Sequence, residues 1–196
     1  MKILAVADHE SKYIWDYFDR EKFSDIDLVI SCGDVKRDYL SFLVTMISAP
    51  LFYVPGNHDT SFIKDPPLGC DLIDMDLVTY KGIRIGGLGG SHMYNNMDFQ
   101  YTYRQMRART RKLEAKIRKA GGIDILVSHA PACGIGDGED LCHRGFPSFN
   151  YILDKYYPKY FIHGHQHLNY GARAKRLTKY MNTTIINAYE YYIFEF

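Results

Sequence analysis

Short, continuously apolar segments that alternate with segments of helical periodicity constrain this fold more than any other feature. The first three apolar runs span residues 3–7, 28–31 and 51–54. Runs of this kind are typical of strands that are buried on both faces. Apolar stripes over 14–18 and 40–47 predict a helix in each interval. The first third of the chain therefore predicts a β-α-β-α-β arrangement with a parallel sheet.

The remaining two thirds predict further helices and a second sheet. The expected elements are a hairpin over 77–85, an amphipathic helix over 103–120, a strand over 123–127, a short helix over 149–156, a strand over 160–162 and antiparallel tail strands over 184–196 that finish the second sheet. A glycine-rich run at 86–90 follows the hairpin. Because this run lacks the lysine and the strand-loop-helix context of a phosphate-binding loop, we interpret it as close backbone packing.

Composition limits the class of protein. With 196 residues, of which 46% are hydrophobic, the chain is long enough for a single domain over 1–196 with a sizeable core. The formal net charge of +1 gives no general bias toward nucleic acid or an anionic membrane. Four irregularly spaced cysteines are typical of reduced thiols. No signal peptide and no apolar run of membrane-spanning length are visible, so we expect a cytoplasmic protein with no membrane partner.

One segment departs from this neutral average. The helix predicted over 103–120 carries eight arginines and lysines. We interpret them as a solvated outer face, with a phosphate or nucleic-acid patch as the alternative. The near-zero net charge of the whole chain favours the first interpretation.

Polar side chains follow the predicted strands, at the edge where ligands gather in open parallel sheets. The clusters are Asp8-His9-Glu10, Gly33-Asp34, Gly56-Asn57-His58-Asp59, Ser128-His129 and His163-Gly164-His165-Gln166-His167. Each cluster alone would be an ordinary turn or a hydrogen-bonded core histidine. Their recurrence at five strand ends predicts one shared site.

Residue type predicts that this site binds metal. Carboxylate, amide and imidazole ligands together suit borderline divalent ions such as Mn²⁺, Fe²⁺ or Zn²⁺. Residues two apart on an extended chain point the same way, so Asp8 and Glu10 can bind one ion, and His165 and His167 share a side. The candidate ligands are Asp8, Glu10, Asp34, Asn57, His129, His165 and His167. They exceed the shell of one ion, so we expect two ions ~3.5–4 Å apart that clamp a phosphoryl group.

Four other histidines are weaker candidates. His9 and His163 would point opposite to their neighbours in an extended segment. His92 and His143 have no spacing argument. We expect both in loops, where they would at most touch substrate.

These motifs resemble the calcineurin-like metallophosphoesterase superfamily. The family pattern is Asp-x-His, Gly-Asp, Gly-Asn-His-Asp/Glu, a lone His after a strand, and Gly-His-x-His. The matching positions are Asp8, Gly33-Asp34, Gly56-Asn57-His58-Asp59, Ser128-His129 and Gly164-His165-Gln166-His167, in the family's order and over nearly the whole chain. The resemblance implies an α/β fold, a four-layer α/β/β/α sandwich of two mixed sheets flanked by helices, with a dinuclear centre between the sheets.

The resemblance also implies a role for each matched residue. The metal ligands it implies are Asp8 and His167 on the first ion, Asn57, His129 and His165 on the second, and Asp34 as the bridge. It implies that His58 stabilises or protonates the leaving oxygen and that Asp59 orients His58.

One position departs from the family pattern. Where the family usually has a histidine, this chain has Glu10. If Glu10 binds the first ion, its negative charge favours a harder ion. The alternative is that Glu10 stays off the metal and that the first site is weak.

The predicted function is phosphoester hydrolysis at two divalent ions, with Mn²⁺ favoured and Fe, Zn or Ni as alternatives. We expect a metal-dependent phosphoesterase, with phosphodiesterase as the favoured activity, in which a metal-activated hydroxide attacks phosphorus and His58 assists the leaving group. The expected substrate is a small phosphodiester or phosphomonoester, held by loops over 91–100 and 131–146. One alternative is a small nuclease, which the neutral charge disfavours. The other is a catalytically weak or inactive scaffold for protein binding, as in the retromer subunit that resembles this family.

Overall fold

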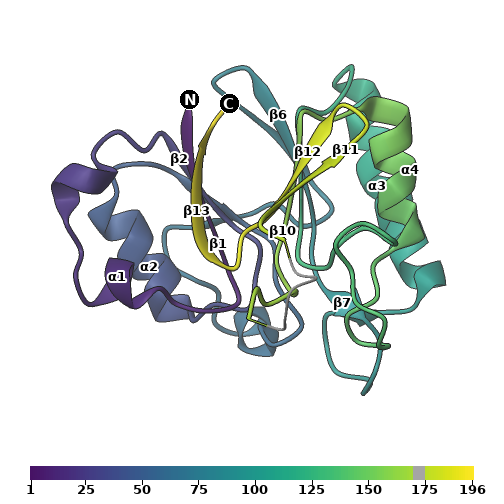
Figure 1. Cartoon of the computed structure of the whole chain (residues 1–196), viewed down its shortest axis with the longest axis horizontal. Coiled ribbons are helices and arrows are strands. Elements are labelled where there is room, and N and C mark those ends of the chain that lie inside the picture. The colour runs from purple at the N-terminus through teal and green to yellow at the C-terminus, as the bar shows by residue number, and fades with distance from the viewer. Residues whose placement is uncertain (170–174) are drawn as a thin grey trace.

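The structure, a computed structural model, describes residues 1–169 and 175–196. Two large sheets lie between flanking helices (Figure 1). The first sheet has the order β13 (Glu190–Glu195), β1 (Lys2–Ala7), β2 (Leu28–Ser31), β3 (Leu51–Tyr53) and β4 (Asp71–Leu72). The second has the order β11 (Leu177–Tyr180), β12 (Thr183–Asn187), β10 (Tyr160–His163), β9 (Ile125–Ser128), β6 (Ile83–Leu88) and β5 (Leu77–Tyr80). A separate short pair joins β7 (Ser91–His92) to β8 (Gln100–Tyr101).

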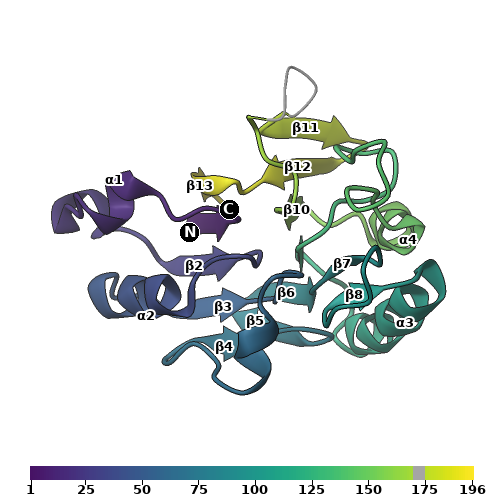
Figure 2. The ribbon, with the colours of Figure 1, turned by 90° about the horizontal axis from the view of Figure 1, so that it is seen from below.

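Helices cover the outer face of each sheet, as Figures 1 and 2 show. The first sheet carries α1 (Lys12–Trp15), α2 (Arg37–Met46) and two short 3₁₀ helices, η1 (Arg20–Phe23) and η2 (Thr60–Ile63). The second sheet carries α3 (Tyr103–Lys119) and α4 (Pro147–Tyr156). The result is the predicted α/β sandwich of two mixed sheets. None of the helices in the described residues is long and apolar enough to cross a membrane.

Strand β1 shows why the apolar runs are continuous. Ile3 and Ala5 face the core between the two sheets, whereas Leu4 and Val6 face the outer core beneath the helices. Because side chains alternate along a strand, a strand buried on both faces needs an apolar residue at every position. Strands β1, β2 and β3 pair in parallel, which confirms the predicted β-α-β-α-β arrangement.

The glycine-rich run at 86–90 lies in close contact with the first sheet's loops. A Cβ atom on Gly87 would collide with the Ile73 carbonyl oxygen, and one on Gly89 would lie 2.6 Å from the Pro55 carbonyl oxygen. Both contacts are with backbone, which cannot move away cheaply. The interpretation of this run as close backbone packing is therefore confirmed.

The tail differs from the prediction of antiparallel strands in the second sheet. Strand β12 runs parallel to β10, although it forms an antiparallel hairpin with β11. The chain then passes from the second sheet to the first, where β13 pairs antiparallel with β1 at the sheet's edge (Figure 1). This pairing covers backbone groups of β1 that would otherwise form an open sheet edge. Helix α1 is also shorter than predicted and ends at Trp15.

Candidate metal centre

Five strands bring predicted ligands together beside one cavity. Asp8 follows β1, Asp34 follows β2, and Asn57 follows β3, while His129 follows β9 and His165 follows β10. The cavity has a volume of about 770 Å³. Its walls include Asp8, Glu10, Asp34, Asn57, His58, Asp59, Tyr94, Cys142, His143, His165 and His167.

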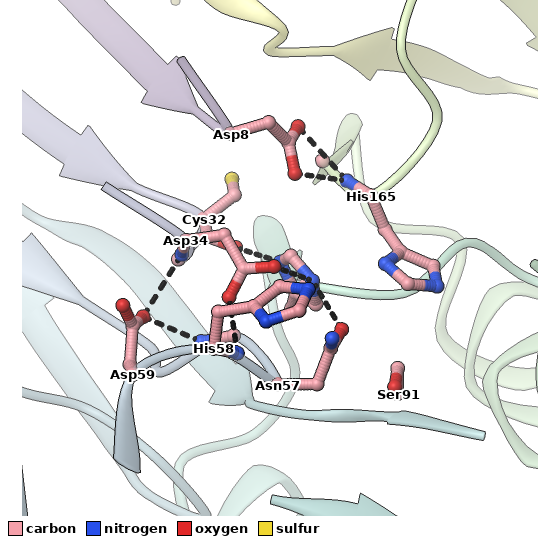
Figure 3. Close-up of polar contacts among 12 residues, drawn as sticks. Asp8, Cys32, Asp34, Asn57, His58, Asp59, Ser91 and His165 are labelled. Carbon is pink, nitrogen blue, oxygen red and sulfur yellow. Dashed lines mark hydrogen bonds and ion pairs between the residues drawn. The ribbon is translucent and has the colours of Figure 1, made fainter. Parts of the chain in front are cut away.

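Unusual backbone turns orient the side chains of three of these residues. Asp8, Asp34 and His165 all have left-handed backbone angles, with φ of 66°, 57° and 65°. Such angles are uncommon outside glycine and cluster at functional sites. Each turn comes just after a buried strand, so the side chain is redirected toward the space between the sheets (Figure 3).

Two glycines allow the turns that carry Asp34 and Asn57 to touch. A Cβ atom on Gly33 would collide with the Gly56 backbone nitrogen, and one on Gly56 would collide with the Asp34 carboxylate. Gly33 also has a φ of 90°, which disfavours any L side chain. Glycine at both positions therefore brings the turn that carries Asp34 against the turn that carries Asn57.

His129 is fully buried and bridges the two sheets. Its Nδ1 lies 2.8 Å from the Cys32 carbonyl oxygen, and since a carbonyl only accepts, Nδ1 is the donor. Its Nε2 lies 3.0 Å from Asn57 Oδ1 and 3.2 Å from Asp34 Oδ2. Although burial opposes protonation, Asp34 and then Asp8 raise the pKa of His129 to about 9. The surrounding oxygens thus favour a positive charge at this point.

His165 is oriented in the same way by a different carbonyl. Its Nε2 donates to the Cys142 carbonyl oxygen at 2.7 Å, which leaves Nδ1 as the nitrogen able to bind a ligand. Burial, and then the nearby His129, lower the pKa of His165 to about 3, so the ring is neutral. Asp34, His129 and His165 each offer one ligand atom, and these atoms lie within 4.8 Å of one another.

Asp8 belongs to the same cluster through the backbone of His165. Both Asp8 oxygens accept from the His165 amide, at 2.8 and 2.9 Å (Figure 3). Burial raises the pKa of Asp8 to about 7. A bound cation would remove this penalty on the ionised carboxylate.

Asp59 holds the two turns together. Its Oδ2 accepts from the Gly56 amide at 2.7 Å and from the Asp34 amide at 2.9 Å (Figure 3). The expected orientation of the His58 ring by Asp59 finds no support in these contacts, because they are made to backbone amides. His58 is exposed, and its own amide donates to Asp34 Oδ1 at 2.8 Å.

Glu10 is bound at the start of α2. Its Oε1 accepts from the Lys36 amide at 2.8 Å, and its Oε2 lies 3.7 Å from the Lys36 ammonium nitrogen. Lys36 is the residue that precedes the first turn of α2, where backbone amides lack helical partners. Glu10 therefore borders the cavity while both of its oxygens have partners outside the ligand cluster.

Three further histidines lie in different surroundings. His167 borders the cavity and packs on Tyr189, with ring centroids 4.9 Å apart. His163 is buried on the other side of its strand, and its Nδ1 lies 2.9 Å from the Gly164 carbonyl oxygen. His92 packs edge-on against Tyr103, with ring centroids 4.7 Å apart.

Three contributors to the site were not identified from the sequence. The backbone carbonyls of Cys32 and Cys142 orient the two buried histidines, and the Tyr94 hydroxyl accepts from Asn57 Nδ2 at 3.2 Å. Any residue has a carbonyl, so the first two leave no sequence signal. Tyr94 does lie in the loop over 91–100 that was expected to build the pocket.

Comparison with known proteins identifies the family. The family model for calcineurin-like phosphoesterases matches residues 1–169. The chain belongs to this family. A 68-residue segment is 34% identical to UPF0046 protein T07D4.2 of Caenorhabditis elegans, covering 34% of this chain and 17% of that protein. This chain thus matches only about a sixth of that relative's length.

Solved structures show the same fold at low identity. The structure of TT1561 of Thermus thermophilus is 14% identical with a TM-score of 0.58, covering 96% of this chain and 89% of its own. The structure of GAP50, described as the anchor in the inner membrane complex of Plasmodium, is also 14% identical, with a TM-score of 0.54 and coverage of 95% and 70%. These two proteins therefore share the fold of this chain.

The residues of this centre fit the divalent metals that the family typically binds. Two buried histidines each donate one ring N–H to a backbone carbonyl, and the other nitrogen of His129 faces the oxygens of Asn57 and Asp34; a carbonyl that orients a ring in this way is usual around a metal. The carboxylates of Asp8, Asp34 and Asp59 lie together in a largely buried site that favours positive charge. Hard oxygen donors and imidazoles in one set suit a borderline divalent ion.

Proposed function

We propose that this protein is a metal-dependent phosphoesterase that hydrolyses small phosphodiesters or phosphomonoesters. The matched orientation of His129 and His165 beside Asp34 carries the proposal, because each ring is fixed by a backbone carbonyl with one nitrogen left for a metal. Membership of the calcineurin-like phosphoesterase family supports the same activity.

The site has donors for two divalent cations. In our assignment Asn57, His129 and His165 would hold one ion, Asp8 and His167 would hold the other, and Asp34 would serve both. When bound, the two cations would lower the pKa of a water molecule toward neutrality and offset negative charge on the phosphoryl oxygens. We favour Mn²⁺, since the set mixes carboxylate, amide and imidazole.

His58 is our candidate for the group that protonates the leaving oxygen. Its ring is exposed at the cavity wall, while its backbone is tied to Asp34 Oδ1. The backbone of His58 therefore stands at a fixed place beside the centre, and our assignment does not use its imidazole as a ligand. Asp59 supports it indirectly, by holding the turns that carry Asp34 and His58.

We further propose that Glu10 stays outside the coordination shell. Its hydrogen bond to the Lys36 amide and its ion pair with the Lys36 side chain support this placement. The ion beside Asp8 would then have fewer protein ligands than its neighbour and bind more weakly. Two binding steps of unequal affinity for Mn²⁺ are the expected result.

The cavity favours a small substrate. Its volume of about 770 Å³ falls within the ~300–1,000 Å³ typical of small-molecule sites. Arg37 and Lys36 border it, and both are paired with carboxylates, Arg37 with Asp38 and Asp65 and Lys36 with Glu10. We favour a phosphodiester over a phosphomonoester and over nucleic acid.

Hydrolysis of bis-p-nitrophenyl phosphate by metal-stripped protein, with Mn²⁺ added back, tests this proposal. We expect turnover that requires the ion and falls in His58→Ala without loss of bound metal. A second candidate is a protein-binding scaffold, favoured by Glu10 at a position where the family has histidine. Absence of turnover with Mn²⁺, Fe²⁺, Zn²⁺ and Ni²⁺ would overturn phosphodiester hydrolysis and favour the scaffold.

A further inference from the structure

A second group of metal-binding side chains lies at the rim of the cavity. It consists of Asp140, Cys142 and His143, all in the loop between β9 and α4, and we call it the rim cluster. The three donors lie within hydrogen-bonding distance of one another. Cys142 Sγ is 2.9 Å from Asp140 Oδ1 and 3.2 Å from His143 Nδ1, and His143 Nδ1 is 2.8 Å from Asp140 Oδ2.

These distances are close to those of a metal site. With Zn–N and Zn–O of about 2.0–2.1 Å and Zn–S of about 2.3 Å, the ligand atoms around a tetrahedral zinc lie roughly 3.3–3.6 Å apart. The donors of the rim cluster need to separate by only about 0.5 Å to admit an ion. The cluster is partly exposed, so the fourth position of a tetrahedron opens to water.

The rim cluster borders the metal centre and is connected to it. Cys142 and His143 form part of the cavity wall. The His143 and His165 rings lie 5.1 Å apart between centroids, and the Cys142 carbonyl accepts from His165 Nε2. An ion on the rim cluster would therefore fix the backbone group that orients a ligand of the centre.

We propose that Asp140, Cys142 and His143 form a separate site for a thiolate-binding divalent cation such as Zn²⁺. Binding replaces the thiol proton of Cys142 with the metal and releases that proton to solvent, while Asp140 gives a carboxylate oxygen and His143 gives Nδ1. The thiolate distinguishes this site chemically from the centre around Asp34, whose proposed ligands are oxygen and nitrogen donors.

A nucleophilic cysteine is the alternative interpretation of this cluster. Activation of a nucleophilic cysteine requires a lowered thiol pKa. Here Cys142 Sγ donates to Asp140 Oδ1 at 2.9 Å, and an adjacent carboxylate disfavours a free thiolate unless a cation lies between the two groups. The arrangement of the three donors is therefore better suited to a cation than to covalent catalysis.

Cobalt spectroscopy of the full chain tests the proposal without any substrate. Metal-stripped protein is titrated with Co²⁺, and the near-ultraviolet thiolate-to-cobalt charge-transfer band is recorded. We expect the band in the wild type, its loss in Cys142→Ser and its retention in Cys133→Ser, a matched change at an exposed cysteine of the same loop. Zn²⁺ should abolish the band by displacement, and Cys142→Ser should bind one Zn²⁺ fewer per chain at equilibrium.

A second variant guards against an effect of Cys142→Ser on folding. His143→Gln keeps the thiol and should weaken Co²⁺ binding at the band by at least about tenfold, because even outer partners of a ligand contribute 10–100-fold. No band in the wild type, or a band that persists in Cys142→Ser, would overturn the proposal. Since hydrolysis is not measured, this outcome is independent of whether the protein is a phosphoesterase.

Discussion

The two sheets contribute different chemistry to the candidate metal centre. The first sheet ends in oxygen donors, Asp8, Asp34 and Asn57, whereas the second ends in imidazoles, His129 and His165. The carboxylates accept from backbone amides, and the imidazoles donate to backbone carbonyls. Backbone N–H groups thus orient the carboxylates, whereas backbone carbonyl groups orient the imidazoles.

Each sheet, with the loops that follow its strands, forms one half of the centre and also orients ligands of the other half. Asp8 of the first sheet accepts from the His165 amide in the second, and His129 of the second donates to the Cys32 carbonyl in the first. Neither half holds its ligands alone. The geometry of the centre therefore depends on the contact between the two sheets. We expect a substitution to affect the centre more strongly when it removes more of the hydrogen bonds between the sheets.

Asp34→Asn should have the largest effect, because Asp34 contacts both halves. Asp34 Oδ2 lies 3.2 Å from His129 Nε2, and Asp34 Oδ1 accepts from the His58 amide. Loss of its charge should remove several kcal/mol of transition-state stabilisation, or roughly 10³–10⁵-fold in kcat/KM. Kinetics with added Mn²⁺ and metal analysis after dialysis are the measurements. Asp16→Asn, an exposed carboxylate on the first half, is the control, and equal losses in the two variants would contradict the assignment.

His58→Ala should lower kcat by about 10²–10⁴-fold, the usual contribution of a general acid. The bound metal should not change, since His58 touches the centre only through its amide. Steady-state kinetics combined with metal analysis separates the two effects. A variant with full turnover would remove His58 from the proposed chemistry, and one that loses metal would make it a ligand.

Asp59→Asn should affect the centre indirectly, by changing the position of the turns that carry Asp34 and Asn57. It weakens the bonds to the Gly56 and Asp34 amides, so we expect a loss of about 10–100-fold in metal affinity, as for other outer partners of metal ligands. Saturating Mn²⁺ should restore most of kcat. If the defect persists at saturating metal, Asp59 takes part in the chemistry more directly than these hydrogen bonds indicate.

His163→Gln should have the smallest effect on the centre, and it separates a structural histidine from the proposed ligand histidines of the second sheet. Burial lowers the pKa of His163 to about 4, against about 6.5 in an unfolded chain. The unfolded state therefore binds the proton first, and His163 makes the free energy of unfolding decrease as the pH falls from about 6.5 to about 4, by up to ~1.4 kcal/mol per pH unit. Denaturant unfolding across this range should show a shallower dependence in His163→Gln. Identical slopes would mean that His163 does not carry this pH dependence.

Much of the fold and of the ligand set could be predicted from the sequence, because both depend on local rules. Continuous apolar runs indicate buried parallel strands, and the ends of parallel strands must meet at one edge. These rules alone predict that Asp34, His129 and His165 lie together. The alternation of side chains along an extended chain also separates His163 from His165.

The remainder depends on contacts between distant segments. The hydrogen bond from the Lys36 amide to Glu10 requires the start of α2 to lie beside the turn that follows β1. No local sequence pattern encodes this proximity. The carbonyl of Cys142 has no sequence signature. The pairing of β13 with β1 joins the two ends of the chain, and the alternation within β13 does not specify its partner.

Anomalous diffraction from crystals grown with Mn²⁺ tests the central claim most directly. The account predicts two peaks in the cavity, both in contact with Asp34, one of them bound also by His129 Nε2 and His165 Nδ1 and the other by Asp8. It also predicts that Glu10 remains bonded to the Lys36 amide. A map without a peak at Asp34, with His129 Nε2 still bonded to Asn57, would contradict the assignment of this site as a metal centre.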